Sequence, residues 1–218
     1  MATAMDPGLP PPAQHGWFTW WDGSSQFSLG AALTTPTTDC VEAELGEQAD
    51  WHARYRASSR HLSLTVTTRS AYRHQVIGAF VAAIDHRLQF SEDLQQRVRT
   101  AVQEATMNAM LHGNLGLGSA LRGDLEGLAR SHDVIESLLA RPPLARSMIR
   151  IDAIWNVAIL HIIVRDSGAG FKRSPPCSIE SPDPMTQTSG RGLMILEAFC
   201  DRVVLLNGGT AIKLGFRL

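Results

Sequence analysis

A nearly unbroken apolar run, Val157 to Val164 (VAILHIIV), constrains the fold of this chain more than any other segment. A run of this length, rich in β-branched residues, is typical of a central strand buried on both faces. It is followed by Asp166, Gly168 and Gly170. Glycines at such a position let the backbone approach a ligand closely or adopt positive φ angles. We therefore expect a strand that leads directly into a binding loop.

A second segment, residues 101–114 (AVQEATMNAMLHGN), spaces three polar side chains four residues apart: Glu104, Asn108 and His112. Residues four apart share one face of an α-helix, so these side chains form a polar stripe. An apolar stripe lies beside it, made of Val98, Val102, Ala105 and Ala109. A carboxylate, an amide and an imidazole at the border of a core are costly unless they have partners. The pattern indicates a functional site.

The third segment, Ser189-Gly190-Arg191-Gly192-Leu193, opens a short apolar helix that continues to Phe199. Free N–H groups at a helix start, flanked by glycines, form a cradle for anions. A polyphosphate is the ligand that such a cradle suits.

The remaining patterns define the fold class. Alternating apolar residues predict strands over 62–66 and 149–153, and residues 69–88 have helical spacing. Ser91 is placed to cap the helix that carries Glu104. A closing hairpin is predicted around Asn207-Gly208-Gly209. With helices on one side, these elements give a two-layer α/β sandwich with a mixed, mainly antiparallel sheet.

Taken in order, E-x-x-x-N on a helix, D-x-G-x-G after a strand and G-x-G-L at a helix start resemble the three nucleotide-binding boxes of the GHKL (Bergerat-fold) ATPases. Each motif alone has an ordinary explanation, namely a solvated helix face, a tight turn or a flexible loop. Within that superfamily, residues 104–113, 166–171 and 189–193 are most similar to the anti-sigma-factor serine kinases of bacterial partner-switching systems. The resemblance covers roughly residues 60–218.

This resemblance implies ATP and Mg²⁺ as ligands and assigns a role to each box. Asp166 would accept a hydrogen bond from the adenine amino group, with Thr210 near the base. Asn108 would ligate Mg²⁺, and Glu104 would take the proton from the acceptor serine. The other predicted nucleotide-binding residues are His112, Gly168, Gly170, Gly190, Arg191, Gly192 and Leu193. Lys172 and Arg173, between the second and third boxes, are either phosphate contacts or solvated side chains.

The implied function is that of an anti-sigma factor which phosphorylates a serine of an anti-anti-sigma partner and also binds a sigma factor. Two alternatives stay open. One is a binding module that sequesters a partner without phosphotransfer, although such a module has no need of Glu104. The other is the catalytic fragment of a histidine kinase, although none of the eight histidines stands in an H-[ED] context.

The amino-acid composition is typical of an ordinary regulatory protein. Twenty basic residues nearly balance 21 acidic ones, which gives no argument for nucleic acid or for an anionic membrane. The three cysteines have no paired spacing, which argues against disulfides and zinc. The sequence contains no run of 18 apolar residues and no secretory leader pattern, so we expect a cytoplasmic protein.

Two regions lie outside the motifs. Residues 1–58 form an extension rich in proline and tryptophan, which we expect to be largely irregular before an ATPase domain over 59–218. Its aromatic cluster at 17–21 either docks on the domain itself or anchors a partner, and a homodimer is possible. A helical insertion at about 115–146 covers the nucleotide, serves a dimer contact or simply decorates the domain.

Overall fold

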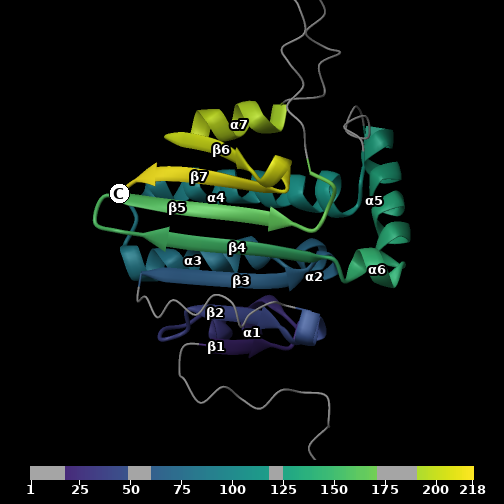
Figure 1. Cartoon of the computed structure of the whole chain (residues 1–218), viewed down its shortest axis with the longest axis horizontal. Coiled ribbons are helices and arrows are strands. Elements are labelled where there is room, and N and C mark those ends of the chain that lie inside the picture. The colour runs from purple at the N-terminus through teal and green to yellow at the C-terminus, as the bar shows by residue number, and fades with distance from the viewer. Residues whose placement is uncertain (1–17, 49–59, 118–124, 171–190) are drawn as a thin grey trace, which may run out of the picture.

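A single mixed sheet with helices on one face forms the framework of the molecule (Figure 1). The computed structural model describes residues 18–48, 60–117, 125–170 and 191–218, without the side chains of residues 47–48, 125–131 and 191. The strands are β1 (Phe18–Trp21), β2 (Asp39–Glu42), β3 (His61–Thr67), β4 (Met148–Trp155), β5 (Ile159–Asp166), β6 (Arg202–Leu206) and β7 (Ala211–Arg217). The α-helices are α1 (Gln26–Ala32), α2 (Thr68–Arg73), α3 (Val76–Leu88), α4 (Glu92–Asn108), α5 (Leu125–Leu139), α6 (Pro142–Ala145) and α7 (Arg191–Phe199).

The strand order is β1-β2-β3-β4-β5-β7-β6. From β3 to β6 every neighbouring pair is antiparallel, whereas β1, β2 and β3 run parallel to one another. The prediction of a mixed, mainly antiparallel sheet in an α/β sandwich is therefore confirmed.

The helical layer packs in the order α1, α3, α4, α7 across one face of the sheet. The core between the layers includes Leu64 of β3, Phe80 of α3 and Val98 of α4, all fully buried. The helix predicted over 69–88 is divided, because His74 adopts an extended conformation between α2 and α3. Ser91 caps α4 as predicted, since its side chain accepts a hydrogen bond from the N–H of Leu94.

The central strand β5 begins two residues later than the sequence predicts. The side chain of Asn156 accepts hydrogen bonds from the N–H groups of Ala158 and Ile159, and this local turn leaves Val157 85% exposed. The expected burial on both faces is also wrong. Leu160 and Ile162 are buried on the helical side, while the alternate positions 161 and 163 are only partly covered.

Residues 18–48 differ from the expected irregular extension, because they form β1, α1 and β2. Trp21 is 1% exposed, and its indole N–H donates to Ser28. The buried carboxylate of Glu42, at the end of β2, accepts hydrogen bonds from the N–H of Thr67 (2.7 Å) and the hydroxyl of Ser70 (2.6 Å). The aromatic cluster thus belongs in part to an edge strand; Trp17 lies outside the described residues.

The predicted insertion contains helices α5 and α6. Helix α5 contacts α2 through an ion pair of 2.9 Å between Arg73 and Glu136, and through a hydrogen bond between Tyr72 and His132. Figure 1 shows α5 at one end of the sheet, beside α6. Within the described part of the chain, no helix is both long and apolar enough to cross a membrane.

Candidate active site

The three sequence boxes meet at one end of α4. The first box lies on α4 and the turn after it, the second follows β5, and the third opens α7. Helix α4 packs against α7, and the turn after α4 packs against β5. Segments that are up to almost ninety residues apart in the sequence therefore surround one place, as the motif interpretation requires.

Helix α4 widens at its end into a π-helical turn, Ala109–Asn114, which the sequence pattern does not reveal. The N–H of Leu115 bonds to the carbonyl of Met110, five residues back. This turn places Gly113 directly against Asp166: a Cβ atom at position 113 would lie 2.6 Å from Oδ1 and 2.8 Å from Oδ2. Only a glycine leaves room for the carboxylate there.

Asp166 is half-buried at the end of β5, where the sheet meets α4. Its Oδ1 accepts the N–H of Gly168 at 2.8 Å, and its own N–H donates to the carbonyl of Thr210 at 3.1 Å. Burial raises the pKa of the Asp166 carboxyl, and the Gly168 hydrogen bond opposes that rise in part. The carboxylate of Asp166 is therefore a fixed, partly desolvated hydrogen-bond acceptor, which suits a donor such as an exocyclic amine.

The β6–β7 turn forms the far side of the second box. Gly170 has φ +87°, and a Cβ atom at this position would lie 2.5 Å from the carbonyl oxygen of Gly208 and 3.2 Å from Thr210 Cγ2. The Thr210 hydroxyl donates to the carbonyl of Asn207 at 3.1 Å. Thr210 therefore lies beside Asp166 through its backbone, while its hydroxyl stabilises the turn.

Glu104 and Asn108 face the start of α7. One carboxylate oxygen of Glu104, Oε1, is buried and has no hydrogen-bond partner among the described residues. Gly192 lies against it: a Cβ atom there would overlap Oε1 and lie 2.9 Å from Asn108 Nδ2. A buried carboxylate without a partner is costly, which is typical of a group kept for chemistry with a ligand.

Two predicted residues of the first and third boxes have other surroundings. The ring of His112 donates from Nδ1 to the carbonyl of Leu117, so it supports the loop that follows the π-helical turn. Leu193, in the first turn of α7, is half-buried. Gly190, the side chain of Arg191, and Lys172 and Arg173 lie outside the described residues.

Asn114 is a site residue that the motif pattern does not identify. Its buried side chain donates to the Thr68 hydroxyl (2.8 Å) and to the carbonyl of Met148 (3.1 Å), and it accepts the N–H of Ser167 (2.8 Å). These partners come from α2, β4 and the second box. Asn114 thereby fixes the second box to the end of α4.

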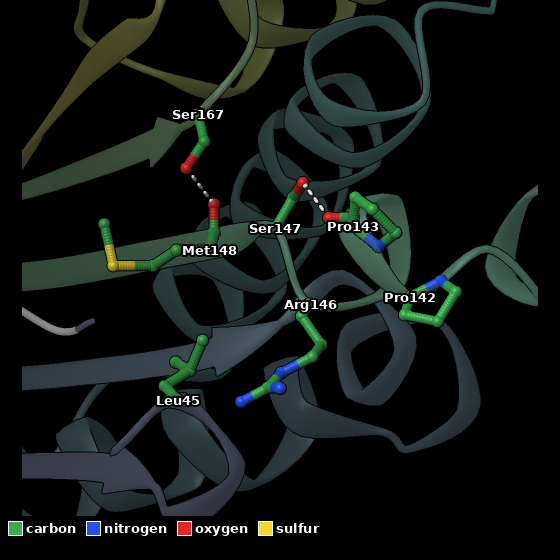
Figure 2. Close-up of a pocket in the computed structure, with 7 residues that line it drawn as sticks. All are labelled: Leu45, Pro142, Pro143, Arg146, Ser147, Met148 and Ser167. Atoms are coloured by element: carbon green, nitrogen blue, oxygen red, sulfur yellow. Dashed lines mark hydrogen bonds between the residues drawn. The ribbon is translucent and has the colours of Figure 1, made fainter. Parts of the chain in front are cut away.

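A pocket of about 520 Å³ adjoins the second box but does not include its carboxylate. It is lined by Leu45, Pro142, Pro143, Arg146, Ser147, Met148 and Ser167 (Figure 2). The Ser167 hydroxyl points to the Met148 carbonyl, with which it forms a hydrogen bond of 3.2 Å (Figure 2). Among the described residues of the three boxes, only Ser167 lines this pocket, so the boxes do not converge on it.

The donor set suits Mg²⁺ held jointly with phosphates. No group of three or more His, Cys, Asp or Glu residues that could bind a metal alone occurs in the ranges that the structure describes. Asn108 offers one hard oxygen ligand, and Mg²⁺ usually completes its shell with phosphate oxygens and water. The unpartnered Glu104 oxygen and the close approach of Gly192 fit a bound polyphosphate with its metal.

This fold and this convergence of motifs define a nucleotide-binding domain, and residues 66–216 match the histidine kinase-like ATPase domain family. The chain belongs to that family, and the family implies ATP binding. The chain is similar to the "Anti-sigma F factor" of Geobacillus thermodenitrificans, at 27% identity over 76% of this chain and 90% of the relative. The protein of the same name from Geobacillus kaustophilus is 25% identical over the same shares, and that from Bacillus cytotoxicus is 25% identical over 68% and 84%.

Proposed function

We propose that this protein is an ATP-dependent serine kinase that acts as an anti-sigma factor in the cytoplasm and phosphorylates an anti-anti-sigma partner. The observation that carries the proposal is the position of Glu104. Its unpartnered carboxylate oxygen lies beside Gly192 of the third box, one helical turn before Asn108. The similarity to proteins named "Anti-sigma F factor" supports the partner class, namely a sigma factor and its antagonist.

Each residue has a defined task in this proposal. Asp166 accepts a hydrogen bond from the adenine amino group, and Asn108 holds Mg²⁺, which supplies charge neutralisation at the phosphates. The N–H groups at the start of α7, with Gly192, hold the phosphate oxygens. Glu104 takes the proton of the acceptor serine. Phosphoryl transfer needs mainly positioning, charge neutralisation and one base, and these residues provide all three.

The decisive experiment compares wild type with Glu104→Gln, using labelled ATP and the antagonist domains encoded by the same genome. Glutamine keeps the size of the side chain but cannot accept a proton at neutral pH. Transfer to serine should fall by about 10²–10⁴-fold, while ATP affinity stays nearly constant. Glu92→Gln is the matched control, because Glu92 is exposed in the first turn of the same helix and should transfer phosphate normally.

The outcomes separate the alternatives. Equal rates for Glu104→Gln and wild type would remove Glu104 from the reaction. If wild type binds ATP and an antagonist but transfers no phosphate to any of these domains, the protein is a sequestering module. Labelling of its own histidine residues would identify it as part of a histidine kinase.

A further inference from the structure

A second pocket, of about 410 Å³, lies between α2, α3 and α4, and its lining includes none of the residues assigned above to the nucleotide. Thr106 of α4 and Met110 of the π-helical turn contribute to its lining. Thr106 follows Glu104 by two residues, which on a helix is about 200° around the axis. The pocket therefore lies on the flank of α4 opposite the polar stripe, and its volume is in the usual range for a small-molecule site.

One end of this pocket suits an anion. The first turn of α3 lines it, and the first N–H groups of a helix have no partner within the helix. Gln75 precedes that turn without capping it through its side chain. Arg99 lines the same end, and its exposed guanidinium forms no ion pair or hydrogen bond with any residue that the structure describes. The lining contains no carboxylate. Two sources of positive potential thus converge without an internal counter-ion.

The other end is apolar and includes one unsatisfied polar atom. Ile77, Met107 and Met110 provide aliphatic and thioether surface. Thr106 is 4% exposed, and its hydroxyl has no hydrogen-bond partner within the described ranges. Threonine in a helix uses two χ1 rotamers, so its hydroxyl can change position by rotation about χ1. A buried hydroxyl without a partner is costly. A ligand that accepts a hydrogen bond from it would remove this cost and would therefore bind more tightly.

We propose that this pocket binds a small organic anion, with its carboxylate at the start of α3 beside Arg99 and its apolar body against Met107 and Met110. Since both sites use α4, such a ligand would bind the same helix as the nucleotide but on the opposite flank. The proposal does not depend on the proposed kinase activity: Thr106, Met107 and Met110 lie within the first box, but no lining residue is among those assigned to the nucleotide, the metal or catalysis.

The test uses the full-length protein and four probes: benzoate, benzamide, acetate and inorganic phosphate. Benzoate should bind saturably and at least tenfold more tightly than the other three, because only benzoate combines charge with an apolar ring. In amide NMR spectra, the largest shifts should occur at Ile77 and Gly78. Largest shifts at Gly168 and Gly192 would place the anion in the nucleotide site and overturn the proposal, as would the absence of saturable binding.

Variants then test the recognition. Arg99→Gln should weaken benzoate binding by about tenfold or more, since it removes the charged partner. Arg141→Gln is the matched control, because Arg141 is exposed and lies outside the pocket. Equal affinity in the two variants would disprove the role of Arg99. Benzamide or phosphate binding as tightly as benzoate would show that the pocket does not select an organic anion.

Discussion

The backbone of Gly192 lies directly against the carboxylate of Glu104, so the third box touches the first without any intervening side chain. A Cβ atom at position 192 would also lie 2.9 Å from Asn108 Nδ2. This contact joins two segments almost ninety residues apart and makes glycine a geometric requirement of the site. The same relationship can be tested directly.

Gly192→Ala should weaken ATP binding by about tenfold or more, because the overpacking forces the start of α7 away from α4. The measurement is calorimetric titration with ATP. Gly30→Ala in α1 is the control: a Cβ atom at position 30 meets nothing within 4 Å, so alanine should raise stability by up to about 1 kcal/mol and leave ATP binding intact. If Gly192→Ala binds ATP like wild type, α7 does not need its close contact with α4.

Asp166→Asn should separate stability from function. Burial raises the folded-state pKa of Asp166, so its ionised form costs stability, and this cost grows as pH rises from the unfolded pKa through the folded pKa. At neutral pH the cost is fully present. Thermal melts without nucleotide should therefore show the asparagine variant to be at least as stable as wild type.

The same variant should lose about tenfold to a hundredfold in ATP affinity, because a charged acceptor is replaced by a neutral one. ATP would then raise its melting temperature much less than that of wild type. An unchanged ATP affinity would remove Asp166 from the adenine site.

Asn108 should determine the response to magnesium. In wild type, Mg²⁺ should raise ATP affinity, and Asn108→Asp should keep this effect because it retains an oxygen ligand. Asn108→Ala should abolish it. Titrations with and without Mg²⁺ give the answer, and an equal benefit in wild type and the alanine variant would place the ion elsewhere.

Asp152 should govern acid stability. Burial acts to raise its pKa, but a hydrogen bond from His61 and the charges of Arg150 and Arg165 outweigh burial and hold the pKa well below its usual range. A depressed pKa stabilises the fold above the unfolded value near 4, and this stability is lost as pH falls through the folded pKa.

Asp152→Asn should therefore cost about 1.5–3 kcal/mol at neutral pH and flatten the loss of stability below pH 4. Denaturant unfolding at several pH values measures both effects. Asp133→Asn, on the exposed part of α5, is the control and should change neither. A cost for Asp152→Asn that persists unchanged at pH 3 would contradict the electrostatic origin.

Sequence patterns predicted those helices and strands that are long enough to show a clear periodicity of apolar residues. The stripe from Val98 to Ala109 determined both the buried side of α4 and the border position of Glu104. By contrast, the four-residue strand β1 has no period that distinguishes it from a loop, so its parallel pairing with β2 was missed.

The same contrast holds for the residues of the candidate site: those in a local sequence pattern can be predicted, and those without one cannot. Asp166 stands out because it follows a strand and precedes glycines. Asn114 does not stand out, because its three partners come from distant segments and its role exists only in the folded chain. The π-helical turn is also not predictable from the sequence, since its residues are compatible with an ordinary α-helix.

The parallel addition of β1 and β2 has a consequence for assembly. Because β2 occupies the backbone hydrogen-bonding groups along one side of β3, that side is closed to any other chain. Among the described strands, β1 and β6 are the outermost strands of the sheet. A strand from a second molecule therefore cannot pair with β3, which would be the border of this sheet if β1 and β2 were absent.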